Sequence, residues 1–130
     1  MRQIRYVSSD IDDTLLDPQE QISQRTWEPV DALREAGIGL MLASGCMIAS
    51  MAPYVQSLSI AYPFIACNGA QIADPKTLQP IDQDLIPLDL LRSLCLYLED
   101  KGCYFQIYDN DTFYFEKPGG YDQSYTRGTG

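Results

Sequence analysis

Residues 1–70 alternate between short apolar runs and longer amphipathic segments, and this alternation limits the folds that the chain can adopt. Short apolar runs typical of buried strands lie at 4–9, 38–44 and 63–70. Between them, 22–37 and 46–58 have the length and spacing of helices, and Gly37 suits a helix stop. This order predicts a Rossmann-like α/β fold, in which a parallel sheet with right-handed crossovers is flanked by helices.

Two prolines leave the ends of the predicted helices open. If Thr26 is the N-cap of the first helix, Pro29 falls in the first turn, where its missing N–H has no consequence. If Ser23 is the N-cap, we expect a kink at Pro29. Pro53 predicts that the second helix is bent or split.

Carboxylates gather where the first apolar run ends, at Asp10, Asp12, Asp13 and Asp17. Parallel sheets bind their ligands at the carboxyl ends of the strands. Three predicted loops meet at that edge, at 10–14, 44–46 and 67–69. We therefore expect the acidic residues to lie where such a sheet places its chemistry.

Two carboxylates held close together suit phosphoryl transfer. One attacks phosphorus, and the other protonates the leaving oxygen and then takes a proton from water. A Mg²⁺ ion would relieve the repulsion between them and neutralise the phosphate. Ser44 can offer its hydroxyl and its backbone N–H to a phosphoryl oxygen, and Gly45 lets the backbone come close.

Composition excludes several other classes of function. The net charge of -9 and the pI near 4.2 argue against nucleic acid and anionic membrane partners. The chain has no histidine, which excludes Ser-His and Cys-His nucleophile pairs and histidine metal sites. No 18-residue apolar run or signal peptide is found, and the 4 cysteines lack metal-site spacing, so we expect a cytoplasmic protein without a membrane partner.

The second half of the chain does not continue the alternation of buried strands and helices. A polar segment at 71–86 predicts a hairpin, 87–102 predicts a helix, and 103–117 predicts an aromatic hairpin. We expect a core at 1–82, a partial α+β cap lobe at 83–118 and a flexible tail at 119–130. The aromatic side chains of the hairpin are either cap core or a surface that stacks a sugar or base.

The runs "DIDDTLLD", "MLASG" and "IACNGA" together resemble the haloacid dehalogenase (HAD) superfamily, and within it the Cof-type sugar-phosphatase branch. The resemblance covers residues 3–117. It implies that Asp10 is the nucleophile and Asp12 the general acid/base, with Mg²⁺ held by the Asp10 carboxylate and the Asp12 backbone carbonyl. It also implies a small phosphorylated substrate, such as a sugar phosphate, and an aspartyl-phosphate intermediate. The candidate phosphate-binding residues are Thr14, Ser44, Gly45 and Asn68.

The chain departs from the pattern of this family. Asp13 replaces a glycine and must adopt a glycine-like conformation, and Cys46 replaces an arginine. The family's lysine and second acidic motifs have no counterpart before Gly130, so we expect truncation within the cap and low activity. In the family the first strand also pairs with a fourth. Here "IRYVSS" becomes an open edge, and we expect a homo-oligomer that covers it.

Other interpretations of the same residues are weaker. An EF-hand needs glycine where Leu15 stands and glutamate where Gln21 stands, and a receiver domain needs an aspartate near Cys67. Ser44 would suit an ordinary helix cap, and a catalytic thiol at Cys46 lacks a histidine partner. The alternative function is a non-catalytic relative that acts as an oligomeric binding or scaffold protein.

Overall fold

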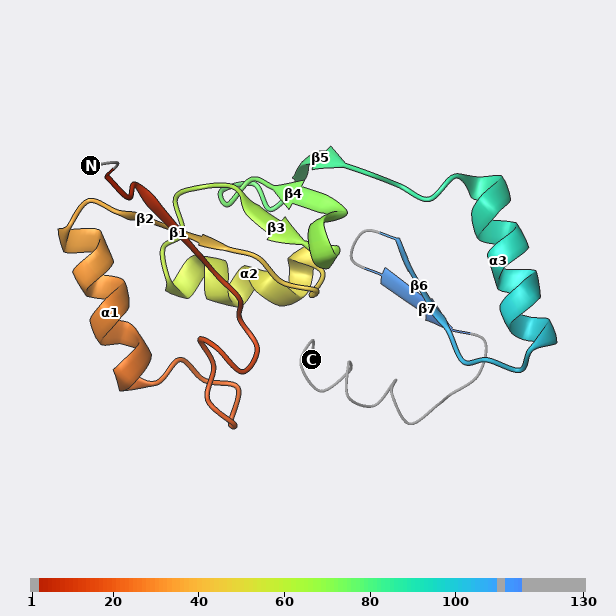
Figure 1. Ribbon diagram of the computed structural model, residues 1–130, viewed down its shortest axis with the longest axis horizontal. Helices are drawn as coiled ribbons and strands as arrows, with labels where there is room; N and C mark the ends of the chain where they lie inside the picture. The colour runs from red at the N-terminus through yellow and green to blue at the C-terminus, as the bar shows by residue number, and fades with distance from the viewer. Residues whose placement is uncertain (1–2, 110–111, 116–130) are drawn as a thin grey trace. The chain divides into compact units, whose positions relative to one another are not determined.

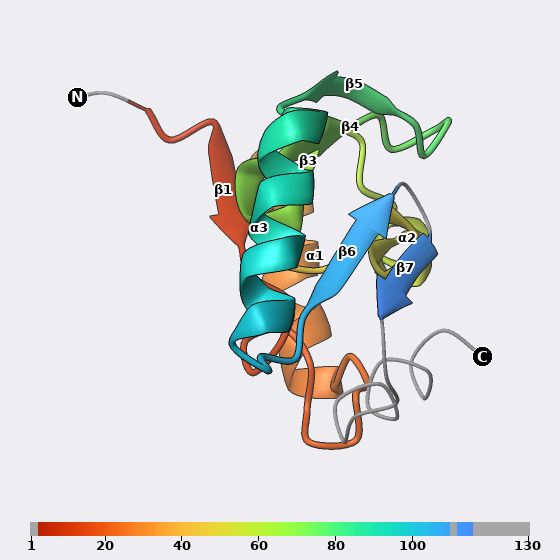
Figure 2. The same cartoon turned by 90° about the vertical axis from the view of Figure 1, so that its right-hand side faces the viewer.

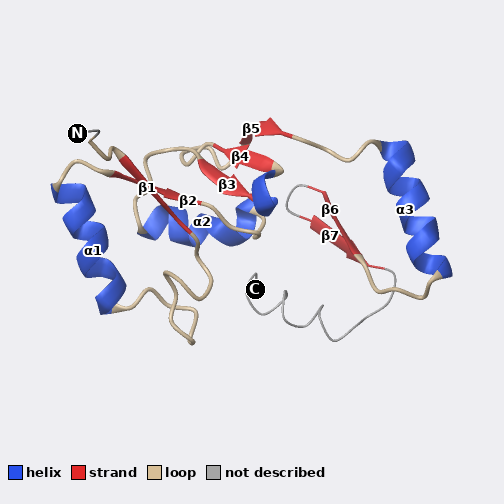
Figure 3. Cartoon of the chain, viewed as in Figure 1, coloured by secondary structure: helices blue, strands red, loops and turns tan. Residues whose placement is uncertain are grey.

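The computed structural model describes residues 3–109 and 112–115. Figure 1 follows the chain by colour, and Figure 3 marks its helices, strands and loops. The chain divides into two compact units, the first ending at Gln83 and the second beginning at Asp84. The tail expected at 119–130 lies outside the described residues. No helix among the described residues is long and apolar enough to cross a membrane.

A parallel strand pair forms the centre of the first unit. β1 (Tyr6–Ser9) lies beside β2 (Gly39–Leu42), in a register that pairs the first residues of the two strands and continues to their last. A parallel bridge between Ala43 and Ile65 then joins the end of β2 to β3 (Phe64–Ala66). The predicted parallel sheet with flanking helices is confirmed.

The chain continues from β3 into an antiparallel sheet of order β3-β4-β5. β4 (Gln71–Ala73) and β5 (Pro80–Gln83) form the hairpin predicted for 71–86, and β3 pairs with β4. The turn between β4 and β5 is closed by Asp74, whose Oδ1 accepts hydrogen bonds from the backbone N–H groups of Lys76 at 2.8 Å and Thr77 at 2.9 Å. Because β4 pairs with β3, the β4–β5 hairpin adds two antiparallel strands beside β3.

The two helices of the first unit resolve the questions raised by the prolines. α1 (Gln24–Glu35) has Ser23 as its N-cap, and Ser23 Oγ accepts a hydrogen bond from the Thr26 N–H at 3.3 Å. Thr26 is therefore not the cap, and Pro29 lies inside the helix. Pro53 likewise lies inside α2 (Ile48–Ser57), which is continuous. Of the two alternatives predicted there, the split is wrong and the bend stays a prediction.

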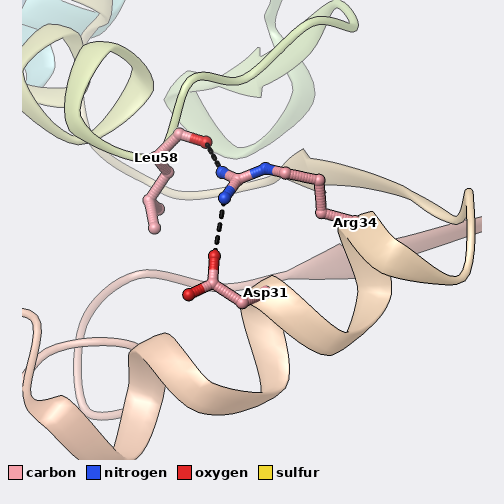
Figure 4. A network of polar contacts seen from close by, with 3 residues as sticks. All are labelled: Asp31, Arg34 and Leu58. Carbon is pink, nitrogen blue, oxygen red and sulfur yellow. Dashed lines mark hydrogen bonds and ion pairs between the residues drawn. The ribbon is translucent and has the colours of Figure 1, made fainter.

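Both helices share one hydrophobic core with the sheet. In Figure 1 they lie below the β1–β2 pair. The largest fully buried side chains are Ile11, Leu42, Met51, Val55, Leu58 and Phe64. The helices are also tied by a polar contact shown in Figure 4, in which Arg34 of α1 binds Asp31 at 2.6 Å and donates to the Leu58 carbonyl after α2 at 3.3 Å.

The other face of the β1–β2 pair carries aromatic side chains. Tyr6 and Tyr62 meet edge to face at 5.1 Å between ring centroids, and they are 49% and 38% exposed. A Cβ at Gly39 would lie 2.5 Å from the Tyr62 ring, so a side chain there would have to displace this pair.

The second unit contains α3 (Leu88–Asp100) and the hairpin of β6 (Gln106–Asp109) and β7 (Thr112–Phe115). Figure 2 shows the two hairpin strands running in opposite directions. The predicted helix and hairpin are both present, although residues 110–111 between the strands lie outside the described residues. No side chain of α3 is buried, and the ring of Phe113 stacks on that of Phe115 at 5.8 Å.

Candidate active site

The first loop of the candidate site winds around the backbone of Ile11. The Ile11 side chain is 1% exposed, and its carbonyl accepts the N–H groups of Thr14, Leu15 and Leu16 at 3.3, 2.9 and 3.1 Å. Its own N–H donates to Asp10 Oδ1 at 2.7 Å, which orients that carboxylate. Asp13 takes φ 54, so the glycine-like conformation predicted for it is confirmed.

Asp17 has a separate role. Its Oδ1 accepts hydrogen bonds from the backbone of Gln19 at 2.9 Å and Gln21 at 3.0 Å, closing a turn beyond the antiparallel bridge between Leu16 and Ile22. One of the four clustered carboxylates is thus explained by local backbone structure.

The second and third loops are joined through their backbones. Ser44 donates its N–H to the Ile65 carbonyl at 3.0 Å and accepts the Asn68 N–H at 3.1 Å. The Cys46 carbonyl accepts the Cys67 N–H at 2.9 Å. Asn68 takes φ 55 in the short turn η1 (Cys67–Gly69), a conformation that asparagine tolerates. Ser44 and Asn68 are therefore held together by the main chain.

The first loop meets the second at Cys46. The Cys46 thiol donates a hydrogen bond to Asp12 Oδ2 at 3.4 Å, and the Cys46 N–H donates to Ser44 Oγ at 3.1 Å. Burial raises the pKa of Cys46 above its usual value of 9.0; the hydrogen bond with Ser44 opposes this shift, and the charges of Asp12 and Asp10 add to it. Asp10, Asp12 and Ser44 are thus gathered around one thiol, which stays protonated at neutral pH.

The groups available to a phosphoryl oxygen differ from those predicted for Ser44. Its backbone N–H is already donated to Ile65, so the expectation that this N–H binds phosphate is wrong. Ser44 Oγ accepts the Cys46 N–H, and the Ser44 hydroxyl also forms the hydrogen bond that lowers the pKa of the Cys46 thiol. Within the described part of the chain, the N–H groups of Asp12, Asp13 and Gly45 have no hydrogen-bond acceptor.

Thr14 lies elsewhere in the first loop. Together with Ser9 and Val30 it lines a cavity of about 440 Å³ between β1 and α1. Among the described residues, no hydrogen bond joins its hydroxyl to another candidate residue.

Tyr54 was missed by the sequence analysis. Burial raises its pKa, and so do the nearby charges of Glu20 and Asp12, which places this α2 side chain beside the acidic loop. Its position one turn after Met51 in a predicted helix signals only a partly buried face, so the sequence carried no functional signal.

The oxygen donors of the first loop are of the kind that hard cations such as Mg²⁺ prefer. No group of three or more histidine, cysteine, aspartate or glutamate side chains that could hold a metal is found among the described residues. The Asp10 carboxylate and the Asp12 backbone carbonyl each have an oxygen that accepts no hydrogen bond within that part of the chain. Mg²⁺ commonly binds one or two carboxylates together with waters and substrate phosphates, so these two oxygens fit it.

Known proteins share both the sequence pattern and the fold. The chain is 27% identical over 117 residues to pyridoxal phosphate phosphatase YbhA of Escherichia coli (strain K12), covering 90% of this chain and 43% of that protein. It is 28% identical over 108 residues to 5-amino-6-(5-phospho-D-ribitylamino)uracil phosphatase YwtE of Bacillus subtilis (strain 168), covering 83% and 37%. The chain therefore spans less than half the length of these relatives.

Solved structures agree with the sequence comparison. A haloacid dehalogenase-like hydrolase from Bacteroides thetaiotaomicron superposes with a TM-score of 0.80 at 21% identity, covering 98% of this chain and 49% of that one. The HAD subclass IIB sugar phosphatase BT4131 superposes with a TM-score of 0.77 at 20% identity, covering 92% and 46%. At this identity the two structures show the fold.

A family model completes these comparisons. The model for haloacid dehalogenase-like hydrolases matches residues 7–129, nearly the whole chain, including all three loops of the candidate site. The chain belongs to the haloacid dehalogenase-like hydrolases.

Proposed function

We propose that this chain supplies the nucleophile and the general acid/base of a phosphatase that acts on small phosphorylated metabolites. The observation that carries the proposal is the convergence of three loops on Cys46, whose thiol contacts Asp12 and whose backbone contacts Ser44 and Cys67. Asp10 lies near enough for its charge to raise the pKa of the same thiol. Two carboxylates beside a serine hydroxyl match the requirements of phosphoryl transfer.

The reaction proceeds in two steps. A carboxylate oxygen of Asp10 attacks phosphorus, an aspartyl-phosphate forms, and the bond to the leaving oxygen breaks while Asp12, protonated at the start of this step, delivers its proton to that oxygen. Asp12 then takes a proton from water as the water attacks phosphorus, which releases phosphate and restores Asp10. Asp12 thus alternates between proton donor and proton acceptor, while Asp10 forms and then loses the covalent bond to phosphorus.

The phosphoryl oxygens are bound by the Ser44 hydroxyl and by the N–H groups of Asp12, Asp13 and Gly45, which have no acceptor among the described residues. Asn68 positions Ser44 by donating its backbone N–H to the Ser44 carbonyl. Thr14 braces the first loop by donating its backbone N–H to the Ile11 carbonyl. No lysine or arginine among the described residues forms an ion pair with Asp10 or Asp12. Mg²⁺ bound by Asp10 and the Asp12 carbonyl would supply the missing positive charge.

The substrate class follows from chemistry and from the relatives. Relatives carry names as phosphatases of pyridoxal phosphate, of a phosphoribitylamino-uracil and of sugars. The substrates in these names are small phosphate monoesters whose leaving group is polar or heteroaromatic. We assign the same class to this chain.

The test is phosphate release from p-nitrophenyl phosphate in the presence of Mg²⁺. We expect activity that is lost on chelation and reduced to the level without enzyme in Asp10→Asn. Asp17→Asn is the matched control, because it removes the same charge from the neighbouring turn and keeps an oxygen acceptor for its hydrogen bonds. Mass spectrometry of the quenched reaction should find one added phosphoryl group on Asp10. Equal activity in wild type and Asp10→Asn would refute the proposal.

A second candidate function is non-catalytic association. β1 lies at the end of its sheet and has β2 as its one neighbour among the described residues. An open strand edge of this kind can pair with a second copy of the chain. Inactivity of the wild type together with a stable oligomer would favour this function.

A further inference from the structure

Cys46 belongs to the second loop of the candidate site and contacts both of the other loops, at Asp12 and at Cys67. Its backbone N–H is bound by Ser44 Oγ at 3.1 Å, and its carbonyl accepts the Cys67 N–H at 2.9 Å. The peptide is therefore held on both sides, and the side chain leaves it in a defined direction. The sulfur lies 3.4 Å from Asp12 Oδ2. Because an ionised carboxylate only accepts hydrogen bonds, the thiol is the donor in this contact.

We propose that Cys46 is a positioning residue for Asp12 in the proposed phosphatase reaction. The thiol hydrogen bond occupies Oδ2 of Asp12 and leaves Oδ1 free to exchange a proton with the leaving oxygen and with water. This inference rests on the proposed function, because it assigns no chemistry to the thiol itself.

Electrostatics explains why Asp12 needs such a contact. Asp10 and Asp12 carry like charges on one short loop, and their repulsion favours a rotation of the exposed Asp12 side chain away from the site. No other hydrogen-bond donor to the Asp12 carboxylate is found among the described residues, and no cation pairs with it there. The thiol is thus the single group in that part of the chain that holds this carboxylate beside Asp10.

The kinetic test compares two replacements of Cys46 with p-nitrophenyl phosphate as substrate. Cys46→Ala removes the donor, and we expect kcat to fall about two- to fivefold, as suits the loss of a weak S–H···O bond, with KM nearly unchanged. Cys46→Ser keeps a donor and should restore most of kcat. Cys103→Ala, which removes an exposed thiol of the second unit, is the control for thiol loss. A structural role would lower kcat in both Cys46 variants alike.

A spectroscopic test reports on the contact without requiring activity. The S–H stretching band in the Raman spectrum shifts to lower wavenumber when a thiol donates a hydrogen bond. The component that disappears in Cys46→Ala belongs to Cys46, and we expect it to move to higher wavenumber in Asp12→Ala. A component that stays in place in Asp12→Ala would overturn the inference, and so would wild-type kcat in Cys46→Ala.

The two proposals fail in different ways. An inactive wild type whose Cys46 band still responds to Asp12→Ala overturns the proposed function, and the catalytic consequence of the contact falls with it. An active wild type whose band does not respond to Asp12→Ala overturns the role of Cys46 alone.

Discussion

The Asn68 side chain lies against the backbone of Gly45. A Cβ built on Gly45 would be 3.1 Å from Asn68 Oδ1 and 3.2 Å from Nδ2, closer than most real Cβ contacts. Asn68 cannot withdraw freely, because its backbone is bound to Ser44 and its φ is 55. A side chain at position 45 would therefore press on the third loop at Asn68.

Gly45→Ala should therefore weaken both the fold and the site. We expect a loss of about 1 kcal/mol in the free energy of unfolding, from overpacking against Asn68, and a higher KM for p-nitrophenyl phosphate. Urea unfolding followed by the fluorescence of Trp27, the one tryptophan in the chain, measures the first. In an Asn68→Gly background the same change should lose less stability, and an equal loss in both backgrounds would refute the contact.

Arg34 should stabilise the first unit mainly through the Leu58 carbonyl. Arg34→Ala removes both the donor to that carbonyl and the pair with Asp31, and we expect a loss of about 1 kcal/mol. Asp31→Ala is the matched control, with a loss below about 0.5 kcal/mol, because the pair is more than half exposed and screened by solvent. Equal losses in urea unfolding would place the stabilisation in the ion pair instead.

The Asp74 turn should give a stability that depends on acid. Hydrogen bonds from the backbone of Thr77 and Lys76 lower the pKa of Asp74 below its usual value of 3.8. The ionised form is favoured by folding, so its contribution is present above pH 3.8 and is lost as the pH falls through the lowered pKa.

Asp74→Asn tests this dependence, because it keeps an oxygen acceptor but carries no charge. We expect the variant to be less stable than wild type at pH 7 and the difference to shrink as the pH falls below 3.8. Asp82→Asn removes the same charge from an exposed position on β5 and gives the background effect. A difference that stays constant over this range would contradict the assignment.

The open edge of β1 can be tested through the direction of its backbone groups. The carbonyls of Arg5 and Ser9 accept hydrogen bonds from the β2 side, at Gly39 and Ala43. In a parallel ladder alternate residues face the same neighbour, so the N–H of Ser8 points away from β2. A proline at position 8 would remove one outward donor and leave the ladder intact.

We propose that a second copy of the chain covers this edge. Light scattering after size exclusion should then find an oligomer for wild type and a monomer for Ser8→Pro, with the circular dichroism spectrum of a folded chain in both. Val7→Pro is the control, because Val7 faces β2 and its replacement should destabilise the fold itself. A monomeric wild type at high concentration would contradict the proposal.

The arrangement of elements followed from local signals in the sequence. The length of the apolar runs and the glycine after the first helix located the strands and α1, because burial and helix termination act over a few residues. The choice of N-cap did not follow, because Ser23 and Thr26 both suit that position. The structure decides it by a distant contact: the Thr26 hydroxyl donates to the Leu15 carbonyl at 3.2 Å, which leaves Ser23 to cap the helix.

The contacts of the site depended on distant parts of the chain. The run from Asp10 to Asp12 and the Ser44-Gly45 pair were visible as a motif, but the acceptor of the Ser44 N–H is Ile65, which only the bridging of two strands brings near. The contact between Cys46 and Asp12 also depends on side-chain rotamers. Both facts belong to tertiary structure, which a pattern of residue types does not specify.

Ser44 forms main-chain hydrogen bonds through both of its backbone polar groups: its N–H donates to the Ile65 carbonyl, and its carbonyl accepts the Asn68 N–H. These hydrogen bonds use backbone N–H and carbonyl groups, which every residue except proline possesses in full. The position of Ser44 is consequently fixed by main-chain hydrogen bonds, and neighbouring side chains of the turn can be replaced without breaking these bonds. A scaffold of this kind lets the surrounding side chains vary while the main chain of Ser44 keeps its position.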